Sequence, residues 1–309
     1  MKPVLVVVNP VSGGGRTAKR WPEFQRALAA AGLEAETVFT GGPGDATGIA
    51  RQGVREGRAL VVAAGGDGTI SETAAGFFAE GAPISGETGF GVLPTGTGGD
   101  FRRTFGIPIE PRAAARVLAD GGRRRIDAGL VRYVDREGHP EQRTFVNIAD
   151  AGIGGEVIHR VNTGPKVLPG AATFFLASVR ALLAWKNRPL AVTIDGLRRE
   201  VVAQQVVVAN CQYFGGGMRM APMAEPDDGL LDVIVVGDVN AIENVRGLGR
   251  IRKGTHLDVP NPKVKAYRGK RIEVESDYPI PIDVDGEGPG TVPAIFEVIP
   301  HALTLMVPT

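Results

Sequence analysis

A short aliphatic run that ends in a glycine-rich loop constrains the fold of this chain more than any other feature. Residues 59–64 are all small or aliphatic, which is typical of a buried strand. The loop that follows consists of Gly65, Gly66, Asp67, Gly68 and Thr69. A helix is predicted from about residue 71 to residue 78. This order of strand, loop and helix offers backbone N–H groups and a helix N-terminus to an anion, and the glycines let a phosphate approach the backbone.

A tight turn in an α/β fold is the alternative interpretation of this loop. Asp67 favours the phosphate site, because an acid beside phosphates makes sense mainly through a bridging cation. Two further glycine-rich loops, residues 9–15 and 94–101, also follow aliphatic runs. Loops at the carboxyl ends of parallel strands predict a nucleotide cleft. The chain contains neither Gly-x-x-x-x-Gly-Lys-Ser/Thr nor Gly-x-Gly-x-x-Gly, so neither a P-loop NTPase nor a dinucleotide fingerprint is supported.

The pattern of elements predicts two domains. The first half alternates strands and helices, as in a parallel sheet with crossover helices. Its expected strands are residues 4–8, 34–39, 59–63 and 89–93, and its expected helices are residues 17–31 and 45–56. Asp45 and Ser71 are expected to help cap the second and third helices. Residues 1–125 are therefore assigned to an α/β domain.

The second half is β-rich and predicts an antiparallel sandwich or barrel. Its expected strands are residues 130–133, 144–148, 190–194, 201–209, 231–236, 263–267 and 271–274, with one helix at residues 171–185. Residues 126–300 form the predicted β-sandwich domain. Residues 301–309 are predicted as a C-terminal strand or tail that packs on either domain.

Composition narrows the partners and the compartment. In the 309 residues, 35 Lys and Arg balance 34 Asp and Glu for a net charge of +1, which argues against nucleic acid as a partner. The single cysteine, Cys211, excludes an internal disulfide framework and favours a reducing cytosol. No apolar run is long enough for a signal peptide or a membrane span. The expected location is cytoplasmic, at most peripheral to the inner face of the membrane.

Residues 65–69 followed by residues 94–97 resemble the bacterial diacylglycerol kinases and related soluble lipid kinases, a family that includes sphingosine and ceramide kinases. The second half carries more of the family's motifs in the family's order, at residues 207–210, 215–218, 221–222, 227–232 and 284–287. The resemblance implies an NAD-kinase-like α/β nucleotide domain joined to an antiparallel β-sandwich, with the active site between them. It also implies Mg²⁺-dependent transfer of the γ-phosphate of ATP to a lipid hydroxyl at a membrane surface; a homodimer is compatible with it.

The same resemblance implies roles for individual residues. The expected ATP contacts are Asn9, Thr40, Gly65, Gly66, Asp67, Gly68, Thr69, Glu72 and Thr97. Asp67 is expected to address the catalytic magnesium with Asp127 as its neighbour, and Glu287 is expected to accept the proton of the lipid hydroxyl. From the residue pattern alone, a solvated turn is the favoured interpretation of Glu287, and an acid at a strand start such as Asp127 more often pairs with a nearby arginine.

An acidic turn at residues 225–230 suits either a hard cation or an Asx-type turn without metal. The resemblance implies a structural magnesium held by the Asp228 carboxylate and by main-chain oxygens of Glu225 and Leu230. The chain also departs from the family at two places. Gly99 stands where the family usually has Asn, and the family's Gly-Phe-Asp is replaced by residues 152–156.

The lipid-facing surface has two candidates. Phe175, Val179, Leu182 or Leu183 and Trp185 form an apolar stripe on the predicted helix, which fits core packing or an acyl-chain groove with basic residues nearby. The basic turn at residues 123–125 allows the same two interpretations, structural or membrane-facing. Two alternatives to a lipid kinase remain at this point: a kinase of a soluble alcohol such as NAD, and a nucleotide- or lipid-binding regulator without catalysis.

Overall fold

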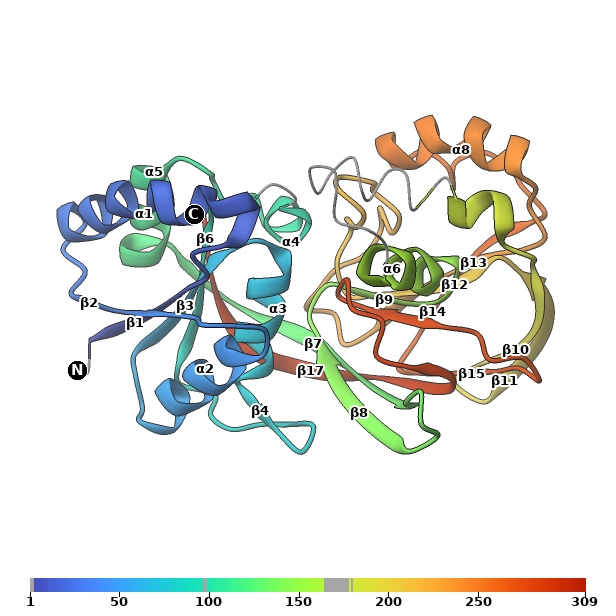
Figure 1. Ribbon diagram of the computed structural model, residues 1–309, viewed down its shortest axis with the longest axis horizontal. Coiled ribbons are helices and arrows are strands. Elements are labelled where there is room, and N and C mark those ends of the chain that lie inside the picture. Colours follow the sequence, from blue (N-terminus) through green and yellow to red (C-terminus); the bar gives the residue numbers. More distant parts are fainter. Residues whose placement is uncertain (1–2, 97–98, 164–177, 179) are drawn as a thin grey trace. The chain divides into compact units, whose positions relative to one another are not determined.

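The computed structural model describes residues 3–96, 99–163, 178 and 180–309. The chain forms two compact units (Figure 1). The first comprises Met1–Ala128 together with Ile299–Thr309, and the second comprises Gly129–Val298. Two long strands, β7 (Gly122–Val134) and β17 (Thr291–Val307), run through the residues at which the chain passes from one unit to the other.

The first unit is a parallel sheet flanked by helices. Its strands are β1 (Val4–Val8), β2 (Ala35–Phe39), β3 (Leu60–Gly65) and β6 (Gly89–Pro94), and a small hairpin pairs β4 (Phe78–Ala79) with β5 (Ala82–Pro83). Its helices are α1 (Ser12–Ala30), α2 (Asp45–Arg55), α3 (Asp67–Ala75), α4 (Asp100–Thr104) and α5 (Pro111–Asp120). The parallel order is β2-β1-β3-β6, and the end of β17 adds a fifth strand beside β6. The last run of the chain thus packs on this unit.

Burial on both faces explains why β1 and β3 are uninterrupted aliphatic runs. One face packs on α1 and α5 through a cluster that includes Trp21, Phe24 and Leu118. The other face carries α2, whose Gly53 leaves no space for a side chain beside Leu5. Figure 1 shows α1 and α5 on one side of the sheet and α2 on the other.

Two expected caps in this unit are wrong. α3 begins at Asp67 with Gly66 as its N-cap, so Ser71 lies inside the helix. The cap of α2 is Gly44, and the Asp45 carboxylate instead accepts the N–H groups of Gly41 and Gly42 in the preceding turn, at 2.8 and 3.0 Å. Both errors arise because a glycine in a non-helical conformation supplies the start of the helix.

The second unit is built from two packed sheets. One sheet has the antiparallel order β14-β13-β12-β9-β16, and in the other β11, β10, β15 and β17 pair antiparallel in that order, with β17 also paired to β7 and β7 to β8. The strands are β8 (Pro140–Phe145), β9 (Ile148–Gly152), β10 (Arg188–Ile194), β11 (Leu197–Ala203), β12 (Gln205–Ala209), β13 (Leu231–Val236), β14 (Val264–Gly269), β15 (Arg271–Glu275) and β16 (Ile282–Val284). Among the described residues, its helices are α6 (Ile153–Thr163), α8 (Ala241–Lys253) and a helical segment at residues 180–184.

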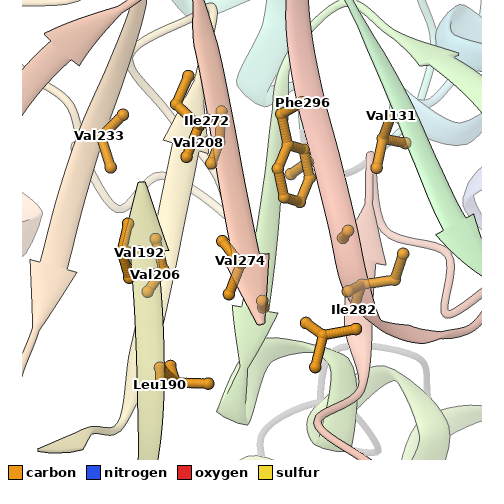
Figure 2. Close-up of a cluster of buried hydrophobic side chains, with 14 of the residues drawn as sticks. Val131, Leu190, Val192, Val206, Val208, Val233, Ile272, Val274, Ile282 and Phe296 are labelled. Atoms are coloured by element: carbon orange, nitrogen blue, oxygen red, sulfur yellow. The ribbon is translucent and has the colours of Figure 1, made fainter. Parts of the chain in front are cut away.

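The core of this unit lies between the two sheets. Figure 2 shows Val192, Ile272 and Val274 of one sheet facing Val206 and Val208 of the other. Alternate residues of each strand therefore fill one shared apolar layer, as the β-rich pattern predicted. The α/β and β-sandwich architectures are both present.

Local details of the second unit differ from the sequence prediction. The run 201–209 is two strands, β11 and β12, which belong to different sheets. The chain changes sheet at Gln204, whose N–H group donates to the carbonyls of Val236 and Gly237. The helices α6 and α8 were not expected. No helix within the described ranges is long and apolar enough to cross a membrane.

The predicted helix at residues 171–185 falls largely outside the described residues, and Phe175 and Val179 lie outside them. Within the described part, Ala181 is buried, whereas Leu183 is 74% exposed. Trp185 is partly buried against the core cluster of the second unit. In that part of the stripe, Trp185 therefore packs on the protein while Leu183 faces solvent.

Candidate functional site

The three glycine-rich loops of the first unit meet at the carboxyl edge of its sheet. A Cβ atom on Gly96 would lie 2.5 Å from the Cα of Gly66, and a Cβ on Gly13 would lie 3.6 Å from the Cα of Gly96. Beneath them, the buried hydroxyl oxygens of Thr17 and Thr95 are 2.6 Å apart and share a hydrogen bond. The convergence that parallel-strand topology predicts is therefore realised at contact distance.

The N-terminus of α3 opens into this loop cluster. Its N-cap residue, Gly66, is extended, and no side chain in the described part of the chain caps the helix. The first N–H groups of a helix lack partners within the helix and carry the positive end of its dipole. A backbone site of this kind binds a phosphate oxygen.

Asp67 joins two of the loops. Its carboxylate accepts the N–H group of Gly99 at 2.7 Å and that of Phe101 at 3.2 Å. Gly99 has φ +72°, a left-handed conformation that Gly and Asn adopt most readily, which accounts physically for a position where the family usually has Asn. A carboxylate has about four acceptor positions, so two remain for a cation. Asp67 therefore fits a role as a magnesium ligand.

The other expected nucleotide contacts lie around the same edge. The Asn9 amide donates to the Thr69 hydroxyl at 3.1 Å, and the Glu72 carboxylate accepts the Gly44 N–H at 3.0 Å. Thr40 continues the edge of β2, with its N–H bonded to the Val8 carbonyl at 2.9 Å. Thr97 lies outside the described residues. These polar groups tie the loops together before any ligand is bound.

Substitution of Gly96 by Ala is expected to weaken nucleotide binding at least tenfold. The contact with the Gly66 backbone cannot give without separating the two loops that would hold the phosphates. Gly48→Ala on α2 is the matched control, because a Cβ there meets nothing within 4 Å. Titration with a fluorescent ATP analogue measures both variants. Equal affinity of Gly96→Ala and wild type would contradict a phosphate role for this contact.

Asp127 is fully buried on β7 in the first unit. Its Oδ1 accepts the N–H group of His301 at 2.6 Å, and the His301 ring Nδ1 lies 3.8 Å from the same oxygen. Among the described residues, no three His, Cys, Asp or Glu side chains are grouped so that they could hold a metal ion. In this arrangement Asp127 fixes the β7 and β17 backbones.

The expected basic turn at residues 123–125 is part of strand β7. The Arg125 guanidinium donates to the His301 carbonyl at 2.7 Å, and that of Arg123 donates to the Glu87 carbonyl at 3.3 Å. The Arg124 guanidinium lies 5.8 Å from the centre of the Phe105 ring. All three side chains thus make contacts within the protein, which favours the structural interpretation.

In the second unit, Glu287 lies on a tight hairpin turn after β16. The Val284 N–H and the Glu287 carbonyl are bonded at 2.8 Å, and the reverse bond is 3.1 Å. The two central residues, Asp285 and Gly286, have φ values of +52° and +91°. Positive φ at both positions is what a two-residue hairpin requires, because its twist then matches the strands.

Asp285 anchors this turn. Its carboxylate accepts three successive backbone N–H groups, those of Val146, Asn147 and Ile148, at 3.0, 3.0 and 3.1 Å. A carboxylate that accepts several N–H groups is a strong, charge-assisted contact. The turn that carries Glu287 is therefore fixed to the segment between β8 and β9.

Arg143 is the residue of this site that the sequence prediction missed. Its guanidinium donates to the Glu287 carboxylate at 2.7 Å. Burial acts to lower the pKa of Arg143, but the hydrogen bond to Glu287 and the charges of Glu287 and Asp285 together outweigh burial, so this pKa is raised. The ion pair holds the Glu287 carboxylate in one orientation. Nothing in the sequence around position 143 signals this contact, which joins residues 144 positions apart.

Two buried acids, Asp150 and Asp283, lie behind the Glu287 hairpin. They are direct partners in the antiparallel pairing of β9 and β16, so their side chains project on the same face. The Asp150 carboxyl also lies against the first turn of α6, since a Cβ on Gly154 would fall 2.0 Å from its Oδ2. Burial raises the pKa of Asp150 to about 7. Burial and the neighbouring Asp150 raise the pKa of Asp283 well above its ordinary value.

This acid pair predicts that stability falls as pH rises from about 4 to about 7. In that window the folded chain retains a proton that an unfolded Asp, with a pKa of 3.8, has already released, so deprotonation favours unfolding. Asp150→Asn is expected to stabilise the protein more at pH 8 than at pH 5, as measured by melting temperature. The exposed Asp277→Asn should retain the wild-type pH profile. If Asp150→Asn changes the melting temperature equally at both pH values, the acid pair does not retain a proton in the folded protein.

The acidic turn at residues 225–230 has the geometry of an Asx-type turn. The Asp228 carboxylate accepts the Leu230 N–H at 3.0 Å, and its other oxygen is bonded to the Arg268 guanidinium. The Arg268 Nε is also 3.4 Å from the carboxylate of Asp232, a residue whose pKa burial raises to about 6. In this arrangement the Arg268 guanidinium supplies the positive charge beside Asp228. The expected magnesium contacts of Glu225, Asp228 and Leu230 stay a prediction.

Two family models match the chain in succession. The diacylglycerol kinase catalytic domain matches residues 3–131, and the YegS C-terminal NAD kinase beta sandwich-like domain matches residues 147–307. Together they cover the two structural units described above.

Relatives with similar sequences extend over nearly the whole chain. A diacylglycerol kinase from Bacillus subtilis (strain 168) is 29% identical, over 96% of this chain and 93% of the relative. A protein assigned as a YegS-like lipid kinase from Chromohalobacter salexigens is 30% identical, over 79% of this chain and 74% of the relative. Among solved structures, a protein proposed to be a diacylglycerol kinase from Bacillus anthracis str. Sterne is 26% identical with a TM-score of 0.77, covering 99% of this chain and 96% of that one.

Proposed function

The chain belongs to the family of diacylglycerol kinases and YegS-like lipid kinases, and on that premise we propose that it transfers the γ-phosphate of ATP to a hydroxyl of a diacylglycerol-like lipid. The observation that carries the proposal is the match to diacylglycerol kinases over 96% of the chain, together with two family models whose ranges contain the glycine loops and the Glu287 hairpin. The lipid is met at a membrane surface, because a diacylglycerol is not released into water as a monomer.

In the first unit, the nucleotide phosphates are proposed to bind the N–H groups at the start of α3 and in the loops around Gly66 and Gly96. Asn9 and Thr69 position the loop edge, and Asp67 is proposed as a ligand of the magnesium that accompanies ATP. A bound Mg²⁺ would neutralise the charge on the phosphate oxygens. Positioning and charge neutralisation of this kind account for most of the catalysis of phosphoryl transfer.

In the second unit, Glu287 is proposed as the general base. The lipid hydroxyl oxygen forms a bond to the γ-phosphorus, the bond from that phosphorus to the bridging oxygen breaks, and ADP leaves. The hydroxyl proton passes to the Glu287 carboxylate, a step that contributes roughly 10²–10⁴-fold in rate. Arg143 holds that carboxylate in place before the lipid arrives.

The test is an acceptor panel. Purified protein is incubated with γ-labelled ATP, Mg²⁺ and, separately, diacylglycerol, other lipids with a free hydroxyl, a soluble alcohol and NAD. Transfer of label to diacylglycerol and not to the soluble acceptors is the expected result. Label on NAD alone would identify NAD as the phosphate acceptor in place of a lipid. ATP binding without transfer to any acceptor would indicate a non-catalytic regulator. Either result would overturn the proposal.

A further inference from the structure

Helix α8 exposes most of its apolar side chains to solvent, which is not expected of a helix that packs only on its own protein. A surface helix normally turns its apolar face inward. Of the four large apolar residues of α8, only Ile251 packs against a core cluster. Ile242, Val245 and Leu248 are 63%, 67% and 43% exposed. No residue of the helix is buried.

The three exposed apolar residues form one row. At 3.6 residues per turn, positions 242, 245 and 248 span an arc of about 120°. The partly buried positions, residues 243, 244, 247 and 251, centre on the other side of the helix, and Ile251 continues the three-residue spacing of the row. The row is therefore continuous, and Figure 1 shows α8 at the outer edge of its own unit.

Basic residues border this row. Arg246, Arg250, Arg252 and Lys253 are exposed, and none forms an ion pair with a carboxylate in the described part of the chain. The only acid of the helix, Glu243, is neutralised by Lys263, whose Nζ lies 2.7 Å from its carboxylate. The helix thus presents an apolar row beside four exposed positive charges. The whole chain has a net charge of only +1, to which α8 contributes these four cations and one acid.

We propose that the outer face of α8 docks the protein on an anionic phospholipid surface, with Ile242, Val245 and Leu248 inserted at the level of the headgroups and the flanking arginines on the lipid phosphates. An apolar row next to basic residues matches the layering of such a surface, where acyl chains lie beneath negative headgroups. Nucleic acid fits less well, because its phosphates offer nothing to the apolar row. The inference rests on the proposed function in one respect only: docking would bring the enzyme to its lipid acceptor.

The apolar row is fixed on a rigid element. The Asn240 side chain accepts the N–H groups of Ile242 and Glu243, and the Glu243 carboxylate accepts the Asn240 N–H, which closes a capping box at the start of the helix. A helix that begins at a defined residue keeps its exposed face in register. Docking then requires no new folding.

Flotation with phosphatidylcholine vesicles, with and without phosphatidylglycerol, tests the proposal in the absence of nucleotide. Wild type is expected to bind the anionic vesicles, and binding should fall as salt increases. Arg246→Gln/Arg250→Gln is expected to weaken it about tenfold or more, and Ile242→Ser/Val245→Ser by a similar factor. Two double variants are used because either could reduce the amount of folded protein. Thermal melting followed by circular dichroism shows whether each double variant is folded.

Matched controls carry the same exchanges elsewhere. Arg26→Gln/Arg55→Gln removes two exposed helix cations, and Leu197→Ser/Val202→Ser removes two exposed apolar side chains, 64% and 47% exposed. Both control pairs should bind vesicles like wild type. If the α8 pairs bind as tightly as wild type, the docking face lies elsewhere and the proposal is wrong. If Ile242→Ser/Val245→Ser instead turns a dimer into a monomer in sedimentation while vesicle binding is unchanged, the face is an interface between two copies.

An activity assay separates this proposal from the proposed function. The α8 pairs should phosphorylate detergent-dispersed diacylglycerol at the wild-type rate and vesicle-borne diacylglycerol about tenfold more slowly. Wild type that binds anionic vesicles through α8 but transfers phosphate in neither format would refute the lipid kinase and leave the docking face in place. Equal loss of activity in both formats would show that α8 acts on the fold or the site, and would overturn docking.

Discussion

Glu287→Gln is expected to reduce phosphate transfer to diacylglycerol by roughly 10²–10⁴-fold while ATP binding is unchanged. The amide has nearly the shape of the carboxylate but cannot accept the hydroxyl proton, and a general base contributes about that factor. The loss should therefore fall on kcat, with the KM for ATP unaltered. Steady-state kinetics with detergent-dispersed lipid measure both constants.

Glu297→Gln is the matched control for this variant. Glu297 is also a glutamate of the second unit held by arginines, Arg132 and Arg271, but it lies on β17 away from the hairpin. Its loss should alter stability and leave kcat near the wild-type value. A Glu287→Gln enzyme with the kcat of wild type would remove Glu287 from the mechanism, while leaving the nucleotide site of the first unit untouched.

Asp285→Ala is expected to have the second large effect, on stability and on turnover together. Three backbone N–H groups would lose a charged acceptor, at a cost of about 3 kcal/mol or more. That cost corresponds to a melting temperature lower by roughly 5–10 °C. The freed hairpin would also no longer hold Glu287, so kcat should fall even at temperatures where the variant is folded.

Asp195→Ala provides an unusually close comparison. Asp195 also has a positive φ, of +46°, and its carboxylate accepts the N–H groups of Lys270 and Arg271 in a different turn of the same unit. The Asp195→Ala variant should be less stable than wild type but keep the wild-type kcat. Asp285→Gly removes the carboxylate but suits the positive φ, so it separates backbone strain from the hydrogen bonds. If Asp285→Ala and Asp195→Ala lower kcat equally, the Asp285 contacts have no special part in positioning Glu287.

Several elements could be predicted because their signal is local. The run at residues 4–8 is strand β1 with the same bounds, and residues 231–236 are β13. The α8 helix was missed although its signal was present: Asn240 followed three residues later by Glu243 is a capping-box pattern. Gly247 and Gly249 lower the helix propensity of that segment and conceal it.

The site shows the same division between local and distant information. The glycine loops and Asp67 are recognisable because strand, loop and helix follow each other along the chain. The Arg143 contact with Glu287 and the shared position of Asp150 and Asp283 join residues from separate strands. No local pattern encodes such pairs, because strand pairing decides them.

The sequence alone determined the two architectures, the three glycine-rich loops and the family, since each depends on short patterns of apolar, glycine and acidic residues. Only the tertiary structure decided what those residues touch. It joined Asp67 to the second loop through Gly99, turned the basic run at residues 123–125 into part of a strand, and left the apolar row of α8 facing outward. Side-chain contacts and exposure depend on which elements pack together, and packing is set by the whole fold.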